Sequence, residues 1–312
     1  MDITEELEQL KLRVAALEQG KPDWLTVKEM IRSSVLQPPL DGPTVPATVP
    51  FMEHSNCVAE DFLHPRYFQL CKLIEETPVW HRKQWEYVFI LHHLDKAGLL
   101  TSGRRGVGFG VGLEPLPSAF ARLGVQVLGT DAPSEIGEGA GWAQNKEHTK
   151  GLAEMRFAWV PEDVFKARVS FQECDMNHIE PSIRNFDFAW SSCCFEHLGS
   201  IEAGLDFVRN SVECCLKVGG IAVHTTELNM SSDTNTVEES PETVLYRRSD
   251  LSSFVDEMTL RGHSVMPLRI APNAHALDFY VDVPPYSQNP HLRLQLAGYA
   301  TTSVGLVIRR GR

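Results

Sequence analysis

The stretch that decides the fold is Gly106-Val107-Gly108-Phe109-Gly110-Val111-Gly112, in which every second residue is glycine. It begins as a short apolar strand pattern and is followed by a helical pattern at residues 115–123. A glycine-rich turn between a strand and a helix lets the backbone approach a ligand, toward which the first N–H groups of the helix point. We therefore expect a nucleotide-type ligand at this turn, with the reservation that such turns are common in proteins.

An acidic residue at the end of the next predicted strand supports this interpretation. Residues 125–129 form an apolar run, and Asp131 follows it, 19 residues beyond Gly112. A carboxylate at this position can accept hydrogen bonds from both hydroxyls of a ribose. A turn residue or a helix cap is the alternative role for Asp131.

Strand and helix patterns alternate through the rest of the chain. Apolar runs typical of strands occur at residues 106–111, 125–129, 169–173, 186–190 and 220–224. Helical patterns stand between them, for example at 115–123 and 201–217, and two more strands are expected at 263–270 and 302–309. This alternation predicts an α/β fold, a Rossmann-like and mostly parallel sheet with helices on both faces.

The remaining N-terminal residues predict a helical extension. A heptad seam with Glu and Lys between its members indicates a short helix over residues 1–20: Ile3, Leu7, Leu10, Val14 and Leu17. This helix either joins copies of the chain into a homo-oligomer through residues 3–17 or packs on its own domain. Residues 21–80 are expected to form a Pro-rich linker and a helical cap, and residues 81–312 the main domain.

Three later motifs narrow the choice of ligand. The third strand ends in Glu173-Cys174-Asp175-Met176-Asn177, and the fourth carries F-D-x-x-x-S-x-x-x-x-E-H-L from Phe186 to Leu198. The fifth strand is preceded by L-K-x-G-G at 216–220. Together with the glycine turn and Asp131, this ordered set resembles the class I S-adenosylmethionine-dependent methyltransferases over about two thirds of the chain.

The resemblance implies S-adenosyl-L-methionine as the cofactor. The turn would approach its methionine and ribose parts through Gly108, Phe109, Gly110 and Gly112. Asp131 would hold the ribose. Asp175 would bind the adenine amino group, with the backbone of Met176 nearby. Ser191 would lie below the sulfonium.

One position departs from the family pattern. The family usually has Asp or Glu where Gly106 opens the turn, and the nearest acid in this chain is Glu114. Gln84 and Trp85, at the start of the first helix of the main domain, are further candidates for cofactor contact. The charged pair Arg82-Lys83 before them could clamp the cofactor carboxylate or simply be solvated.

Two further stretches, His81-Arg82-Lys83-Gln84-Trp85-Glu86 and Tyr280-Val281-Asp282-Val283-Pro284-Pro285-Tyr286, also resemble a bacterial methyltransferase subfamily associated with surface-glycan genes. That resemblance implies a small-molecule or carbohydrate acceptor.

Methyl transfer to a hydroxyl also needs a base, because the acceptor proton leaves as the new bond forms. His197, after the fourth strand, is the first candidate for the base, although a structural role is the alternative. Glu227 and His224, at the end of the fifth strand, are expected at the acceptor rim. Glu227 with Asn229 could instead hold a divalent ion, but no tight ligand spacing supports one, so no metal is predicted. O-methylation is favoured over N-methylation.

Composition sets outer limits on function. The net charge of −12 argues against a nucleic-acid partner, which clustered Lys and Arg would bind. The acidic first residues do not resemble a signal peptide, and no segment is long and apolar enough for a membrane span. Seven cysteines form neither a disulfide framework nor a zinc motif. We therefore expect a cytoplasmic protein.

Two other functions are compatible with the glycine turn. An NAD-dependent oxidoreductase would share the turn and the ribose acid, but the fourth-strand motif and the lack of a central Tyr-x-x-x-Lys pair disfavour it. A non-catalytic module that senses the cofactor and recruits a partner through the heptad helix is the second alternative.

Overall fold

The structure is a computed structural model that describes residues 8, 11, 14–15, 40–133, 148–287 and 289–312. The predicted heptad seam, apart from Val14, lies outside the described residues, as does the beginning of the Pro-rich stretch.

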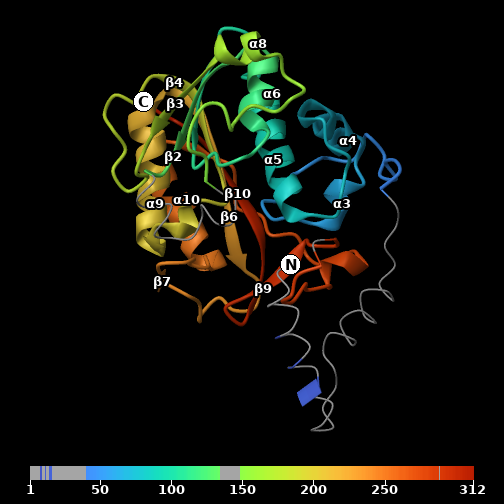
Figure 1. Ribbon diagram of the computed structural model, residues 1–312. Helices are drawn as coiled ribbons and strands as arrows, with labels where there is room; N and C mark the ends of the chain where they lie inside the picture. Colours follow the sequence, from blue (N-terminus) through green and yellow to red (C-terminus); the bar gives the residue numbers. More distant parts are fainter. Residues whose placement is uncertain (1–7, 9–10, 12–13, 16–39, 134–147, 288) are drawn as a thin grey trace.

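A central sheet organises the described part of the chain (Figure 1). Its strands are β1 (Arg105–Phe109), β2 (Gln126–Asp131), β3 (Val169–Glu173), β4 (Phe186–Ser192), β6 (Leu216–Asn229), β8 (Ser264–Val265), β9 (Arg293–Leu296) and β10 (Tyr299–Arg309). The order is β3-β2-β1-β4-β6-β10-β8, and β9 pairs with β10. The first five strands of this order are parallel, whereas β10 is antiparallel to its neighbours. The predicted α/β class and mostly parallel sheet are confirmed.

The position of β10 separates this sheet from a dinucleotide-binding fold. The doubly wound dinucleotide fold has the order 3-2-1-4-5-6 and is built from two similar mononucleotide-binding halves. In this chain the first half is present, but an antiparallel strand occupies the place beside β6. The second half therefore lacks the parallel β-α-β arrangement that binds a second nucleotide.

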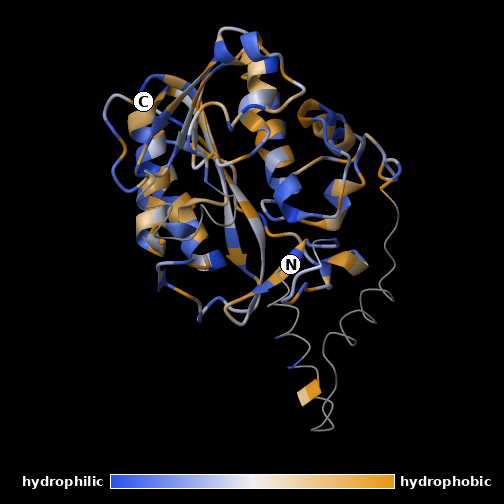
Figure 2. Ribbon diagram, in the orientation of Figure 1, coloured by the Kyte–Doolittle hydropathy of each residue, from blue (hydrophilic) through white to orange (hydrophobic). Residues whose placement is uncertain are grey.

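Helices cover both faces of the sheet. On one face lie α5 (Arg82–Lys96), α6 (Leu116–Arg122) and α8 (Glu162–Lys166). On the other lie α9 (Ile201–Asn210), the π-helical turn η3 (Ser211–Cys215) and α10 (Arg248–Leu260). Ser200 caps α9, because its hydroxyl accepts a hydrogen bond from Ala203 N at 3.1 Å. Figure 2 shows polar and apolar residues interleaved along α5, α9 and α10, the pattern of helices that bury one face.

The N-terminal part of the described chain packs on α5. It contains α3 (Ala59–Phe62), α4 (Pro65–Cys71) and η1 (Lys72–Ile74), three short helices in the region where the sequence predicts a helical cap. The break arises because Pro65 begins a new helix and His64 caps it, accepting from Arg66 N at 3.0 Å. Residues 51–74 share a hydrophobic core with α5, α6 and the sheet.

The remaining elements are short. They are η2 (Phe195–His197), the paired strands β5 (Gly199–Ser200) and β7 (Glu239–Ser240), and η4 (Ala276–Asp278). Among the described residues, no helix is both long and apolar enough to cross a membrane.

Candidate functional site

The candidate site lies at the edge where the parallel strands end, the end toward which the arrow of β6 points in Figure 1. Parallel strands bring the residues that follow them to one edge of the sheet, and ligands of open α/β folds bind there. The glycine turn, Asp131, Asp175 and Glu227 all stand at or after the ends of such strands. The topology therefore places these residues at one edge of the sheet.

Close packing and backbone conformation require glycine in the turn. A Cβ on Gly108 would lie 2.3 Å from the Trp190 ring. Gly110 has a φ of +60°, and a Cβ there would lie 2.8 Å from Cys194 Sγ and 3.7 Å from Met176 Sδ. The turn, the end of β4 and Met176 thus meet at Gly110. The bare backbone at this point is what a ligand in close approach needs.

Asp131 ties the glycine turn to the segment after β2. Its carboxylate accepts hydrogen bonds from the backbone N–H groups of Gly112 at 3.1 Å, Ala132 at 2.8 Å and Thr149 at 3.0 Å. Burial raises the pKa of Asp131, and these hydrogen bonds oppose that rise. A carboxylate has about four acceptor positions, so this arrangement leaves room for one ribose hydroxyl rather than for both.

Asp175 and Met176 follow β3 at the same edge. Asp175 accepts from Asn177 N at 2.9 Å and contacts His178 Nδ1 at 2.9 Å, and its side chain remains 33% exposed. Met176 is buried beside the glycine turn.

Three residues predicted for the site point into the core instead. Ser191 Oγ and His224 Nδ1 are 2.8 Å apart, and His224 Nε2 is 2.9 Å from Ser211 Oγ. Both nitrogens of the fully buried His224 ring are therefore occupied, and burial lowers its pKa to about 3. Phe109 packs edge-on against Phe207 with ring centroids 5.2 Å apart. The prediction that His224 stands at the acceptor rim is wrong, because its side chain lies on the face covered by α9 and η3. The side chains of Ser191, expected below the sulfonium, and of Phe109, expected in the turn that approaches the cofactor, lie on the same face.

Gln84 and Trp85 are also structural rather than ligand-binding. Gln84 Oε1 accepts from Val79 N at 2.9 Å, and Gln84 Nε2 donates to Glu76 Oε2 at 2.8 Å. Trp85 is fully buried and donates its Nε1–H to Asp61 Oδ2 at 2.7 Å. Their prediction as cofactor contacts is wrong, because this face of α5 holds the N-terminal helices.

The opposite face of the first turn of α5 carries a buried cluster of charges, which we call the Arg82–Glu227 cluster. Its members are Arg82, Lys83, Glu86, Ser192, Cys193, Glu196, Thr226, Glu227 and Ser303. Three sheet strands contribute, since Ser192 ends β4, Glu227 lies near the end of β6, and Ser303 is the partner of Glu227 on β10. Sequence reasoning noted several of these residues but missed that the sheet gathers them. The available signal was the i, i+4 spacing of Arg82 and Glu86.

Glu86 is the centre of this cluster and is fully buried. It pairs with Arg82 at 3.2 Å and Lys83 at 2.9 Å, and accepts from Ser192 Oγ at 3.0 Å and Ser303 Oγ at 2.5 Å. Burial raises the pKa of Glu86, but Lys83 and Arg82 outweigh it and lower the pKa to about 2. Buried ion pairs cost desolvation energy and add little stability, so such a network at a ligand edge indicates a functional site.

Glu227 lies in this cluster, at the edge where the sequence places it. One carboxyl oxygen pairs with Arg82, while the other, Oε2, is buried and has no hydrogen-bond partner among the described residues. Burial raises the pKa of Glu227, and Arg82 opposes the rise. Glu227 therefore presents one carboxyl oxygen without a partner at the carboxyl edge of the sheet.

His197 does not join the Arg82–Glu227 cluster. It ends η2, is half-buried, and its Nδ1 bonds to the backbone carbonyl of Glu242. The neighbouring Glu196 turns the other way and accepts from Thr226 Oγ at 3.0 Å.

The departure at Gly106 has a packing explanation. A Cβ at Gly106 would lie 2.3 Å from the Phe188 ring, so an acidic side chain does not fit there. Glu114 is buried below the turn and accepts from Trp190 Nε1 at 2.5 Å. Burial raises the pKa of Glu114 to about 8. The nearest acid after the turn is therefore bonded to β4 in the core.

A second polar group that sequence reasoning missed lies in the C-terminal insert. Asp282 is fully buried and contacts His291 Nδ1 at 2.8 Å and Ser287 Oγ at 2.8 Å. The His291 ring stacks on His81, which caps α5, and the His291 carbonyl accepts from Arg82 N at 3.0 Å. The insert thus helps to hold the first turn of α5 in place.

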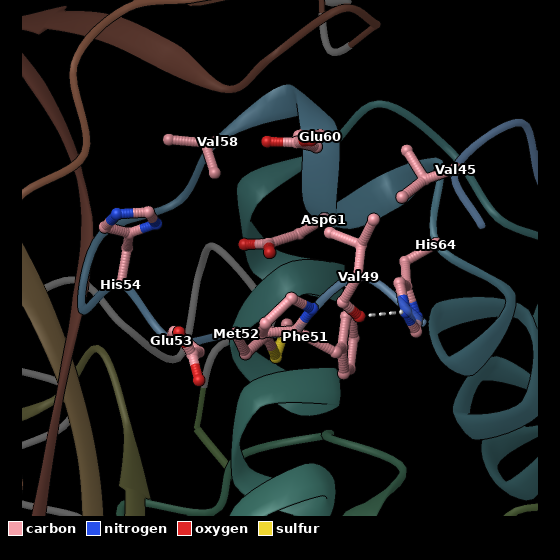
Figure 3. Close-up of a pocket in the computed structure, with 11 residues that line it drawn as sticks. Val45, Val49, Phe51, Met52, Glu53, His54, Val58, Glu60, Asp61 and His64 are labelled. Carbon is pink, nitrogen blue, oxygen red and sulfur yellow. Dashed lines mark hydrogen bonds between the residues drawn. The ribbon is translucent and has the colours of Figure 1, made fainter. Parts of the chain in front are cut away.

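Two cavities lie away from this edge. One, of about 150 Å³, is lined by residues of the 45–64 segment and is shown in Figure 3. There the carboxyl groups of Glu60 and Asp61 point toward the side on which His54 lies, and His64 bonds to the Val49 carbonyl. The other, of about 280 Å³, lies between α9 and α10. The first is smaller than typical small-molecule sites, which span roughly 300–1,000 Å³.

Comparison with known proteins gives no match to a family model and no match to a curated protein. Several solved structures are similar in fold. Phosphoethanolamine N-methyltransferase 2 from Haemonchus contortus, in complex with S-adenosyl-L-methionine, is 22% identical over 56% of this chain, with a TM-score of 0.36. The matched part is 37% of that chain, so this chain spans well under half of it.

Two other similar structures are matched over most of their length. The glycopeptide N-methyltransferase MtfA is 15% identical over 70% of this chain and 94% of that chain, with a TM-score of 0.41. An S-adenosylmethionine-dependent methyltransferase from Clostridium acetobutylicum ATCC 824 is 11% identical over 79% of this chain and 96% of that chain, with a TM-score of 0.38. At these identities and scores the likeness concerns the fold alone.

Proposed function

We propose that this protein is an S-adenosylmethionine-dependent methyltransferase that methylates a hydroxyl group of a small or carbohydrate-like acceptor. The observation that carries the proposal is that the glycine turn and the Arg82–Glu227 cluster lie at the same edge of the sheet. The glycine turn is held by Asp131 through Gly112 N at 3.1 Å, and the buried Arg82–Glu227 cluster lies at the ends of the neighbouring strands. The proposed cofactor site and the proposed, charged acceptor site thus lie next to each other.

In the proposed cofactor site, the residues of this chain bind and orient the cofactor. The glycine turn with Gly108, Gly110 and Gly112 approaches the methionine and ribose parts, Asp131 accepts from a ribose hydroxyl, and the edge at Asp175 and Met176 takes the adenine. When bound, S-adenosylmethionine supplies an electrophilic methyl group, so the protein has mainly to align it with the acceptor oxygen.

On the acceptor side, Glu227 is the better candidate for the base. Its Oε2 has no hydrogen-bond partner among the described residues, and burial raises its pKa, which favours uptake of a proton. His197 stays a second candidate through its position after β4, although its Nδ1 is bonded to the Glu242 carbonyl. The charged and hydroxyl side chains of the cluster suit a polar acceptor that bears several hydroxyls.

The same proposal includes a cytoplasmic location. All seven cysteines are free thiols, including the vicinal pairs Cys193-Cys194 and Cys214-Cys215. Free thiols are typical of proteins in reducing compartments.

Calorimetric titration with S-adenosylhomocysteine, in parallel with NADH, tests the cofactor assignment. We expect S-adenosylhomocysteine to bind the wild type and NADH not to bind. Asp131→Ala removes the acceptor of three backbone N–H groups and should weaken binding at least tenfold, about 1.4 kcal/mol. Asp163→Ala, which changes an exposed acid in α8, is the matched control and should bind like the wild type.

Either of two results would contradict the proposal. A preference for NADH would favour the oxidoreductase alternative. S-adenosylhomocysteine binding without transfer of labelled methyl to pooled sugars, sugar nucleotides and small hydroxyl compounds would favour the non-catalytic module.

A further inference from the structure

We propose that Cys193, Glu196 and Glu227 bind a divalent zinc ion at the ends of β4 and β6. The thiol sulfur and one carboxyl oxygen from each glutamate lie within 4.8 Å of one another. One sulfur and two carboxylate oxygens are a ligand set that zinc accepts, with metal–ligand distances of about 2.0–2.3 Å. Sequence spacing alone does not indicate this site, because Glu227 reaches it only through the pairing of β4 with β6.

The backbone places the thiol in the group. Cys193 follows β4 with a φ of +49°, a left-handed conformation that is unfavourable for a residue other than glycine. Its N–H holds that conformation by donating to the carbonyl oxygen and the hydroxyl of Thr225, at 3.1 and 3.2 Å. If Cys193 had the extended conformation of a strand, its side chain would point away from Glu196 and Glu227.

Each carboxylate ligand is held by a neighbour, as ligands of metal sites usually are. Arg82 pairs with one oxygen of Glu227, and Thr226 donates to Glu196 Oε2 at 3.0 Å. The second oxygen of Glu227 is buried without a hydrogen-bond partner among the described residues, and Glu227 is only 3% exposed. A buried, unpaired carboxylate oxygen costs free energy that a metal ion would recover.

The charges balance with a divalent ion. The cluster holds three carboxylates, on Glu86, Glu196 and Glu227, against the two cations of Arg82 and Lys83, an excess of one negative charge. Metal binding releases the Cys193 thiol proton to solvent, which brings the excess to two. A divalent ion then makes the cluster neutral. Glu86 loses the thiol as a hydrogen-bond donor at 3.0 Å but keeps four other partners.

Three protein ligands leave the fourth zinc position open, as in catalytic zinc sites. That position would take the acceptor oxygen and ease loss of its proton to solvent, a role that rests on the proposed function. In that case Glu227 acts as a metal ligand rather than as the base itself. The metal binding does not depend on the acceptor, so it can be tested separately.

The test is titration of the purified full-length chain with Co²⁺, a spectroscopic stand-in for zinc, followed by displacement with Zn²⁺. Thiolate ligation of Co²⁺ gives an intense near-ultraviolet charge-transfer absorption. We expect this absorption to saturate at one equivalent and to disappear on addition of Zn²⁺. Cys193→Ser should abolish it, and Glu227→Gln should weaken Zn²⁺ binding by about 10–100-fold or more.

Cys194→Ser is the matched control, because its thiol lies one residue away but bonds to the Gly110 carbonyl at 3.2 Å, outside the three-ligand group. This variant should keep the absorption. Absence of the absorption in the wild type, or its persistence in Cys193→Ser, overturns the proposal. If Cys193→Ser fails to fold, unchanged Zn²⁺ affinity in Glu227→Gln overturns it. S-adenosylhomocysteine titration of the same samples separates this failure from failure of the cofactor assignment.

Discussion

At the scale of single residues, the site depends on positions where the packing around the sheet restricts the backbone conformation. Gly110 combines a positive φ with a close approach of Cys194, and Cys193 adopts a positive φ although it is not glycine. The first opens the backbone to a ligand, and the second directs a thiol into the Arg82–Glu227 cluster. Both follow from the sharp turns that β1 and β4 must make at the same edge.

Substitution of Gly110 tests whether the glycine turn binds the cofactor. Gly110→Ala would place its Cβ 2.8 Å from Cys194 Sγ and strain a φ of +60°, so the turn must shift. We expect S-adenosylhomocysteine binding, measured by calorimetry, to weaken by tenfold or more.

Gly103→Ala is the control for strain alone, because Gly103 also has a positive φ but a Cβ there meets nothing within 4 Å. It should lower the melting temperature slightly and leave binding unchanged. Equal losses of S-adenosylhomocysteine binding in the two variants would show that Gly110 affects the stability of the protein and not the shape of the cofactor site.

At the scale of elements, the sequence was informative where a pattern is local. The five parallel strands, the glycine turn and the Ser200 cap follow from short-range apolar runs and capping chemistry. The sequence was uninformative about which face of the sheet a side chain takes, because helices cover both faces and β4 and the second half of β6 are buried on both. Ser191 and His224 were therefore assigned to the site but lie under α9.

Long-range pairing set the second limit on prediction. Arg82 and Glu227 are brought together only when α5 packs across β6 and β10. The same holds for Asp282 and His291 in the insert before β10, where turns and buried polar groups replace any helical or strand period. Gln84 and Trp85 were misassigned for a related reason, since the N-terminal helices that cover them could not be placed from sequence.

The insert offers an element-scale prediction. Asp282→Ala removes the acceptor of Ser287 N, Ser287 Oγ and His291 Nδ1, and leaves buried donors unpaired at a cost on the order of 3 kcal/mol. We expect hydrogen exchange to quicken at Ser287 N. It should also quicken at Arg82 N, which bonds to the His291 carbonyl.

The control is Asp233→Ala, an exposed acid whose carboxylate accepts from Ser249 N at 2.9 Å. It should leave exchange in the insert and in α5 unchanged. Normal protection of Arg82 in Asp282→Ala would refute the link between the insert and the first turn of α5.

At the scale of the whole molecule, buried carboxyl groups make stability depend on pH. Burial raises the pKa of Asp61 to about 7, although Trp85 Nε1 donates to it at 2.7 Å. The folded state therefore keeps a proton that the unfolded chain releases near pH 4. The contribution of Asp61 to the free energy of unfolding therefore falls as pH rises from about 4 to 7 and is constant above pH 7.

Asp61→Asn tests this pH dependence. The wild type should lose on the order of 2–3 kcal/mol of unfolding free energy through this group between pH 5 and 8, whereas Asp61→Asn should lose less. Thermal unfolding of both proteins at several pH values measures the difference. Parallel curves would mean that Asp61 titrates normally in the folded protein.

The place of β10 has a consequence for how the chain is made. Although β10 is last in sequence, it lies inside the sheet, between β6 and β8, and supplies Ser303 to the Arg82–Glu227 cluster. During synthesis, one edge of β6 stays open until β10 has left the ribosome. Exposed strand edges invite pairing with other chains. Loss of β10 would therefore yield an aggregation-prone fragment rather than a folded chain that lacks only Ser303.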